Sequence, residues 1–167
     1  MHYSWTCHCC GKQFDELPLA FGLDSPDPWL ALTEAERESR GAISSDTCII
    51  DDKHFFVRGC LEIPLNDQSG IFSWSVWVSV SEKSFKRITD LWETDIRDGE
   101  LPFFGWLSNN ITIYPDTFAL KTNLYLRNHG TRPFIDLEPT NHPLAREQRE
   151  GISLQRVEEI IAACGMH

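Results

Sequence analysis

The chain has 167 residues, of which 41% are hydrophobic and 11% aromatic, and this composition excludes an intrinsically disordered protein. Its 25 acidic and 15 basic side chains give a formal net charge of -10 at pH 7, so we expect no binding to nucleic acid or to an anionic membrane surface. No apolar run approaches the ~20 residues of a membrane span, and residues 1–14 lack the apolar stretch of a signal peptide, so we expect a cytoplasmic protein whose six cysteines are reduced or bind metal.

The N-terminal part of the chain is expected to hold a cysteine-rich knuckle, a loop and one short helix. The knuckle occupies residues 1–14, and two prolines mark 22–28 as a loop. Thr33 is followed three residues later by Glu36, the pattern of a capping box, which predicts a helix over 34–40. Because no repeat or linker divides the sequence, we treat 1–167 as a single domain that includes the knuckle.

The middle of the chain is expected to form paired strands. Residues 48–50 and 54–65 have the composition of two strands joined by a turn at 51–53. Residues 72–80 alternate between a consistently apolar set and a mostly polar set of side chains. Since successive side chains of a strand point to opposite faces, one face of this strand is expected in the core.

The C-terminal half adds two helices and two strands. Ser81 is predicted to cap a helix whose apolar residues recur every three or four positions, and 154–164 form a second such helix. Residues 118–126 and 133–138 are predicted strands. Because helices only rarely separate strands that are adjacent in sequence, the pattern indicates an α+β fold with an antiparallel or mixed β-sheet and a few packed helices.

Cys7 and Cys10 are separated by two residues and are followed by Gly11. This Cys-x-x-Cys-Gly spacing lets two thiolates reach one tetrahedral zinc ion, and the alternative is a degenerate knuckle that binds no metal. A redox motif is disfavoured because the pair is at the extreme N-terminus rather than at a strand-to-helix junction. No second pair exists in the sequence, so further ligands must be scattered residues. The available ones are Cys48, His54, Cys60 and His142.

Two further segments are candidates for a site. His142 stands between Glu138 and Glu147, which suits a metal or acid/base site, although a histidine that orders a proline-rich connection is the favoured interpretation. Residues 103–107 are aromatic around a glycine and suit either a binding pocket or a loop that fills the core; we favour the core. The common catalytic signatures are absent from the sequence.

Nine stretches of the sequence form a recognisable set: 7–11, 15–18, 44–48, 54–59, 77–82, 104–107, 114–117, 137–140 and 142–152. Taken together, they resemble the bacterial family catalogued as domain of unknown function 2199. The family has no established activity, so the resemblance implies only a bacterial cytosolic protein with an N-terminal Cys-x-x-Cys knuckle. It also places Cys48 and His142 within the family pattern, and we therefore predict zinc bound by Cys7, Cys10, Cys48 and His142.

The function we predict is a non-enzymatic, acidic protein-interaction module, comparable to immunity or adaptor proteins, with zinc as a structural element. Its partner is expected to be a protein, and the chain a monomer or a homodimer. The alternative is a metal-dependent hydrolase that uses Cys7, Cys10 and His142 with Glu138 or Glu147 as the base. A structural site is closed by four protein ligands, whereas a catalytic site keeps one position open for water.

Overall fold

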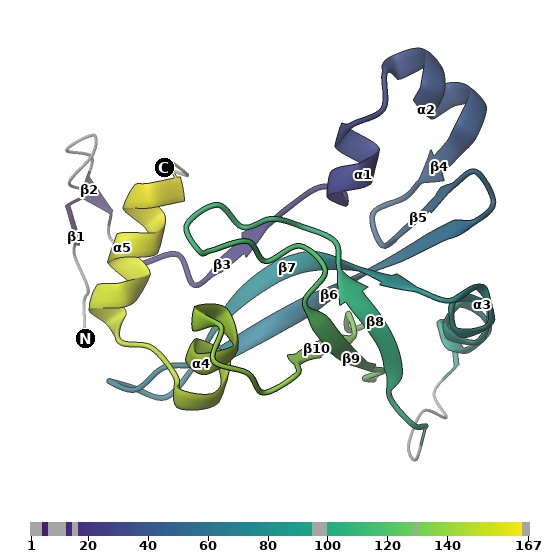
Figure 1. The fold of residues 1–167 in the computed structure, drawn as a ribbon. Helices are drawn as coiled ribbons and strands as arrows, with labels where there is room; N and C mark the ends of the chain where they lie inside the picture. The colour runs from purple at the N-terminus through teal and green to yellow at the C-terminus, as the bar shows by residue number, and fades with distance from the viewer. Residues whose placement is uncertain (1–4, 7–12, 15–16, 95–99, 129, 165–167) are drawn as a thin grey trace.

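The fold combines five helices with ten strands in the part of the chain that the computed structural model describes, residues 5–6, 13–14, 17–94, 100–128 and 130–164 (Figure 1). The chain is therefore α+β, as its sequence predicts. The helices are α1 (Asp27–Leu30), α2 (Glu34–Arg40), α3 (Glu82–Leu91), α4 (Pro143–Glu150) and α5 (Leu154–Cys164). The strands are β1 (Trp5–Thr6), β2 (Gln13–Phe14), β3 (Ala20–Gly22), β4 (Gly41–Ile43), β5 (Thr47–Ile50), β6 (His54–Pro64), β7 (Ile71–Val80), β8 (Phe103–Leu107), β9 (Lys121–Tyr125) and β10 (Phe134–Leu137).

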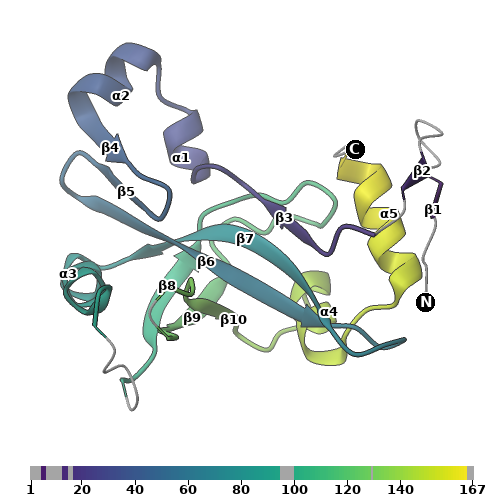
Figure 2. The same cartoon turned by 180° about the vertical axis from the view of Figure 1, so that it is seen from behind.

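Strands β6 to β10 close into a barrel (Figures 1 and 2). Each strand pairs antiparallel with the next one along the chain, and β10 returns to pair in parallel with β6. A glycine stands at two of these seams. A Cβ atom on Gly59 would lie 2.8 Å from the carbonyl oxygen of Pro133, and one on Gly105 would lie 2.7 Å from that of Ser79. The backbones approach this closely only because neither residue carries a side chain.

The two long strands of the barrel also pair with strands outside it. β6 has 11 residues and β7 has 10, so each meets different neighbours at its two ends. β3 adds to β7 in parallel, while β5 adds to β6 and β4 adds to β5, both antiparallel. The strand order is β3-β7-β8-β9-β10-β6-β5-β4, so the sheet is mixed, one of the two predicted arrangements.

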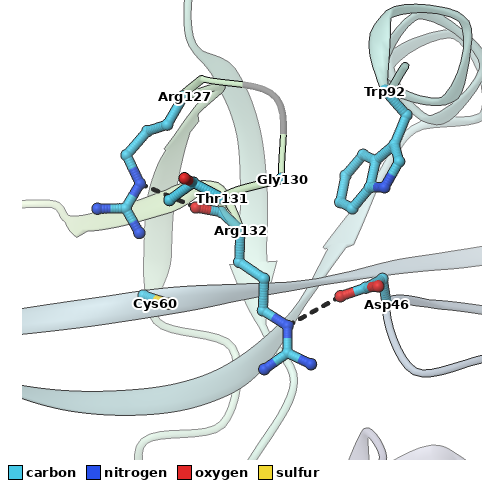
Figure 3. A pocket seen from close by; sticks show the side chains of 7 residues that line it. All are labelled: Asp46, Cys60, Trp92, Arg127, Gly130, Thr131 and Arg132. Carbon is cyan, nitrogen blue, oxygen red and sulfur yellow. Dashed lines mark hydrogen bonds and ion pairs between the residues drawn. The ribbon is translucent and has the colours of Figure 1, made fainter.

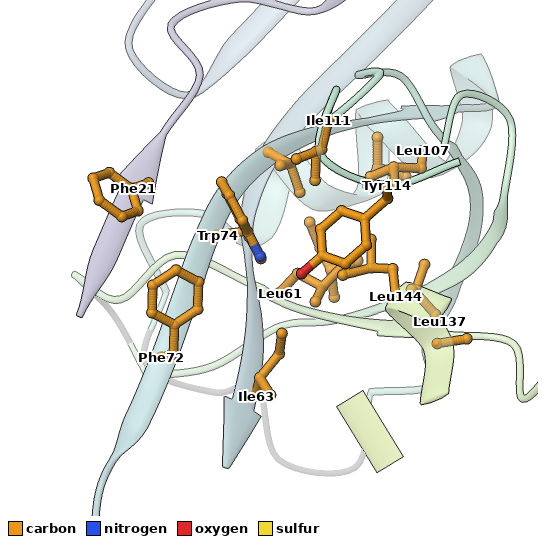
Figure 4. Packing of buried hydrophobic residues seen from close by; sticks show 14 of the residues in the cluster. Phe21, Leu61, Ile63, Phe72, Trp74, Leu107, Ile111, Tyr114, Leu137 and Leu144 are labelled. Atoms are coloured by element: carbon orange, nitrogen blue, oxygen red, sulfur yellow. The ribbon is translucent and has the colours of Figure 1, made fainter. Parts of the chain in front are cut away.

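The main hydrophobic core joins the barrel to the two C-terminal helices. Figure 4 shows Leu144 of the first of these helices among the buried side chains of the barrel. Helices α4 and α5 contribute Leu144, Val157 and Ile160, which are completely buried. Each such side chain contributes roughly 1.5–3 kcal/mol by leaving water. The predicted inner face of 72–80 is confirmed, and β6 also turns one face to this core. These faces consist of Phe72, Trp74, Val76, Val78 and Val80 on β7 and of Phe55, Val57, Leu61 and Ile63 on β6.

A second, smaller cluster packs separately from the main core. Trp77 belongs to it because successive side chains of β7 point to opposite faces, and Trp74 and Val76 already face the main core. The indole Nε1–H of Trp77 donates to the carbonyl oxygen of Leu23 at 2.9 Å, so its one polar group is satisfied. The second cluster consists of Cys48, Ile50, Phe56 and Trp77, with Trp29 and Leu32 packed against it.

The predicted helix starts are confirmed. The hydroxyl of Thr33 accepts a hydrogen bond from the N–H of Glu36, and the carboxylate of Glu36 accepts one from the N–H of Thr33. Helix α3 begins after Ser81, whose hydroxyl accepts from the N–H of Ser84. Local capping rules therefore suffice to place these two helices.

Several segments differ from the sequence prediction or lie beyond what is described; helix α1, for example, begins inside the predicted loop 22–28. Residues 103–107, expected as a core-filling loop, form strand β8. The predicted strand 118–126 begins only at Lys121, because Ala119 has a φ of 70°, a left-handed conformation that a strand does not contain. Residues 7–12 of the predicted knuckle lie between β1 and β2 and outside the described residues. None of the described helices is long and apolar enough to cross a membrane.

Candidate functional site

Cys48 is one of the predicted zinc ligands, and the structure places it on β5 inside the second cluster. Its side chain is completely buried, and this burial raises the pKa of the thiol to about 12. Zinc binds the thiolate form of cysteine, which an apolar environment disfavours. In the described structure Cys48 is therefore a neutral thiol that packs against aromatic and aliphatic side chains.

His142 caps the start of α4. Its Nδ1 accepts a hydrogen bond of 3.1 Å from the N–H of Leu144, which requires the proton on Nε2, and Nε2 lies 3.0 Å from the carbonyl oxygen of Pro115. Both ring nitrogens are thus used to fix a proline-rich connection, the interpretation favoured from the sequence. Because Nδ1 holds the remaining lone pair in this hydrogen bond, the ring presents no free lone pair to a metal ion.

The structure does not bring Cys48 and His142 together. Figures 1 and 2 show β5 and α4 at opposite ends of the barrel. Cys7 and Cys10, the other two predicted ligands, lie outside the described residues. Among the residues that are described, no group of three His, Cys, Asp or Glu side chains is arranged to hold a metal ion.

Glu147, a candidate base of the hydrolase alternative, belongs to an ion-pair network. Its carboxylate accepts hydrogen bonds from Arg156 Nε at 2.7 Å and from the Tyr114 hydroxyl at 2.5 Å. Burial raises the pKa of Tyr114 first of all, and the neighbouring carboxylate raises it further. The other candidate, Glu138, is exposed, and the ring of His142 is directed at backbone groups rather than at either carboxylate. The network joins the loop before β9 to α4 and α5.

Strands β8, β9 and β10 carry aromatic side chains on the outside of the barrel. On β8, Gly105 and Leu107 are buried, while Phe104 and Trp106 are 48% and 43% exposed. Tyr125 on β9 is 38% exposed, and it stands opposite Phe134 of β10. We call Phe104, Trp106, Tyr125 and Phe134 the outer aromatic face.

The rings of the outer aromatic face contact one another in two pairs. Phe104 and Trp106 meet edge to face, with centroids 5.1 Å apart and planes at 84°. Tyr125 and Phe134 lie 6.3 Å apart. Such geometries favour the pairs beyond their buried area, so the rings hold fixed positions while their outer surfaces stay in water.

Acidic side chains accompany these rings. Asp136 stands on β10 opposite Asn123 of β9, and partial burial raises the pKa of its carboxyl group. Glu138, Lys121 and Trp106 line a small hollow of about 180 Å³ beside the face. The carboxyl groups of Asp136 and Glu138 thus lie near exposed aromatic rings, together with the ammonium group of Lys121.

The sequence prediction for residues 103–107 was right for the buried Leu107 and wrong for Phe104 and Trp106. Four of the five residues are large and apolar, so no alternation is visible in the sequence, and the glycine occupies an inward position. Only an indirect signal remains in the sequence, which is Gly105 itself. A glycine within a strand often marks a close approach of two strands, and if Gly105 points inward, Phe104 and Trp106 point outward.

Comparison with known proteins gives one result. A family model described as an uncharacterized protein conserved in bacteria, domain of unknown function 2199, matches residues 6–152. No curated protein and no solved structure matches the chain.

Proposed function

The chain belongs to this bacterial family of uncharacterised proteins, and we propose that it is a non-enzymatic interaction module that binds a basic protein through the outer aromatic face. The observation that carries the proposal is the exposure of Phe104, Trp106 and Tyr125 on adjacent strands. The predicted cytoplasmic location is part of the same proposal.

Exposed aromatic rings on a rigid scaffold suit protein recognition. Tyrosine and tryptophan dominate the energetics of many protein interfaces because they bury a large area and lose little rotamer entropy. The rings of Phe104 and Trp106 are already fixed by their mutual contact on a barrel strand. Binding would therefore require little additional ordering, which favours affinity.

The net charge of the chain favours a partner of the opposite charge. A formal net charge of -10 attracts basic proteins over long distances and repels acidic ones. Asp136 and Glu138 supply carboxyl groups next to the rings, and aromatic faces themselves attract cationic side chains. A partner that presents lysine or arginine beside an apolar contact fits this combination.

Zinc remains part of the proposal as a structural ion at Cys7 and Cys10. Its role would be to hold the N-terminal segment, and the Cys-x-x-Cys-Gly spacing supports it. Cys48 and His142 were predicted to complete the site. Because Cys48 is packed in an apolar cluster and both ring nitrogens of His142 are in hydrogen bonds, we propose that other residues complete the zinc site at Cys7 and Cys10.

The experiment is site-specific photo-crosslinking in the producing bacterium. A benzophenone amino acid replaces Trp106, and in the matched control it replaces Ile71, which is 49% exposed on β7 outside the face. We expect a product at Trp106 that is absent at Ile71, and the captured protein should be basic. The captured protein is then purified and its affinity measured against the Trp106→Ser and Ile71→Ser variants.

Three outcomes reject the proposal. They are the absence of a product specific to Trp106, an acidic partner, and binding that Trp106→Ser leaves unchanged. A product between two copies of the chain would instead assign the face to a homodimer, and sedimentation of Trp106→Ser would then show a monomer.

A further inference from the structure

A hollow of about 470 Å³ lies beside β6, between the turn before β5, the loop before β10 and the end of α3 (Figure 3). Asp46, Arg132 and Trp92 line it from these three segments. Its volume falls within the roughly 300–1,000 Å³ of small-molecule sites. The hollow shares no residue with the outer aromatic face, so a ligand site here is independent of the proposed function.

The guanidinium group of Arg132 lines this hollow, and that of Arg58, which is not part of the lining, lies next to it. Arg58 Nε donates a hydrogen bond of 2.9 Å to the hydroxyl oxygen of Ser75. Arg132 Nη1 lies 3.5 Å from the same oxygen. The two cations therefore share one neutral acceptor, and like charges this close repel each other in a partly buried environment.

The carboxylates of the region compensate these charges only in part. Asp46 accepts from Arg132 Nε at 2.8 Å, whereas the carboxylate that Arg58 meets in the described structure is the fully exposed Asp24, whose oxygen is 3.9 Å away. The side chain of Arg58 is 12% exposed. Burial lowers the pKa of Arg58, and the charge of Arg132 lowers it further, while the charges of Asp24 and Asp46 oppose this fall. A partly buried cation whose nearest carboxylate is exposed and 3.9 Å away is compensated incompletely, and a bound anion would complete the compensation.

The position of Arg58 is fixed before any ligand arrives. Its guanidinium lies over the ring of Trp77, 5.7 Å from the centroid, and Nη1 donates to the carbonyl oxygen of Ser45 at 3.3 Å. Gly22 leaves room for it, because a Cβ atom there would lie 2.8 Å from Arg58 Nη2. Contacts of this kind preorganise a binding group.

We propose that this hollow binds the oxyanion group of a small molecule, a carboxylate or a phosphate, between Arg58 and Arg132. Guanidinium groups match both oxyanions with paired N–H donors. The indole of Trp92, which Figure 3 shows turned toward the hollow, contacts the body of the molecule. The carboxylate of Asp46 already accepts a hydrogen bond from Arg132 Nε, so it competes with the ligand for this arginine. The ligand either displaces the Asp46 carboxylate or binds beside it.

A nucleic acid does not fit the same chemistry. A polyanion is repelled by the net charge of -10, whereas a small anion responds to the local field of two adjacent arginines. The enclosing segments also limit the hollow to about 470 Å³. The ligand is therefore a small molecule with one anionic group directed at the arginines.

The test is calorimetric titration of the purified full chain with phenyl phosphate, benzoate and inorganic phosphate, with phenol as the neutral probe. The variants are Arg132→Gln, Arg58→Gln and Asp46→Asn. Arg146→Gln is the matched control, since Arg146 is 57% exposed and pairs with Glu150 at 4.0 Å, away from the hollow. Each variant is first checked for an unchanged melting profile. Arg132 and Asp46 are partly exposed, so their substitutions should not prevent folding. If Arg58→Gln fails to fold, the Arg132→Gln and Asp46→Asn variants decide the test.

We expect phenyl phosphate or benzoate to bind and phenol not to bind. The affinity should fall roughly tenfold or more in Arg132→Gln, because a charge-assisted hydrogen bond is lost, and should stay unchanged in Arg146→Gln. Asp46→Asn should bind more tightly than the parent, because the competing charge is gone. The stronger of the two probes identifies the oxyanion. The inference is overturned if neither probe binds at millimolar concentration, if Arg146→Gln loses as much as Arg132→Gln, or if Asp46→Asn weakens binding.

Discussion

The hydroxyl of Tyr114 donates a hydrogen bond of 2.5 Å to the carboxylate of Glu147 and thereby ties the loop before β9 to helix α4. Tyr114 is 6% exposed and the side chain of Glu147 is 18% exposed, so water does not easily replace either group. Arg156 of α5 binds the same carboxylate at 2.7 Å and lies over the Tyr114 ring, 5.6 Å from its centroid. Three segments thus depend on one carboxylate.

Removing the charge of Glu147 should destabilise the fold. We expect Glu147→Gln to lower the free energy of unfolding by roughly 1–3 kcal/mol, because a buried hydroxyl and a guanidinium lose a charged acceptor. Urea denaturation measures the change. Glu159→Gln is the matched control: Glu159 pairs with the same arginine at 3.3 Å but is 58% exposed, and it should stay within about 0.5 kcal/mol of the parent. Equal losses in both variants would contradict the role of the network.

The raised pKa of Tyr114 gives the stability a dependence on alkaline pH. The unfolded chain ionises its tyrosines near pH ~10, whereas the folded chain keeps Tyr114 protonated above that value. The unfolded state therefore binds fewer protons, and stability should be fully present below pH ~10 and fall by up to ~1.4 kcal/mol per pH unit above it. Tyr114→Phe should show a shallower fall in the same denaturation series. A parent and a variant with identical slopes would refute the assignment.

Alternation along β8 separates the outer aromatic face from the core. Leu107→Ala should lower the free energy of unfolding by roughly 2–5 kcal/mol, because the completely buried side chain leaves a cavity. Phe104→Ala on the same strand should cost far less, since its ring is 48% exposed. Thermal denaturation of the pair checks the order. A larger loss in Phe104→Ala would mean that the face is covered by the protein itself.

The zinc prediction has a direct test at the N-terminus. Protein purified from zinc-supplemented cells should carry about one equivalent of the metal, and the Cys7→Ser, Cys10→Ser variant should lose both the metal and thermal stability. Ile71→Ser is the control, because Ile71 is 49% exposed and carries no metal-binding atom. Metal analysis and melting curves decide the matter, and an unchanged melting temperature in the double variant would remove the prediction.

Local signals in the sequence account for much of the fold. The capping box at Thr33 and the period of two in 72–80 depend on residues close together in the chain, and both are confirmed. Closure of the barrel is a long-range event. It depends on close approach at Gly59 and Gly105, and nothing local distinguishes these glycines from turn residues.

The candidate sites were harder to predict for the same reason. Arg58, Ser75 and Arg132 are separated by long stretches of chain, and each is by itself an ordinary polar residue. Only the pairing of β6 with β7 and β10 places them together. The interpretation of His142 as a residue that orders its connection is confirmed, because the chemistry of a helix cap is local, whereas its role as a zinc ligand stays a prediction.

The most direct test of the proposed function is the affinity of the crosslinked basic partner for two purified variants, Trp106→Ser and Ile71→Ser. Aromatic anchors at interfaces typically contribute about 2 kcal/mol or more, so we expect Trp106→Ser to weaken binding by roughly thirtyfold or more and Ile71→Ser to leave it unchanged. Binding by the parent should also weaken as salt is raised. Equal affinities of the two variants would contradict the account, since the exposed rings of β8 would then have no part in recognition.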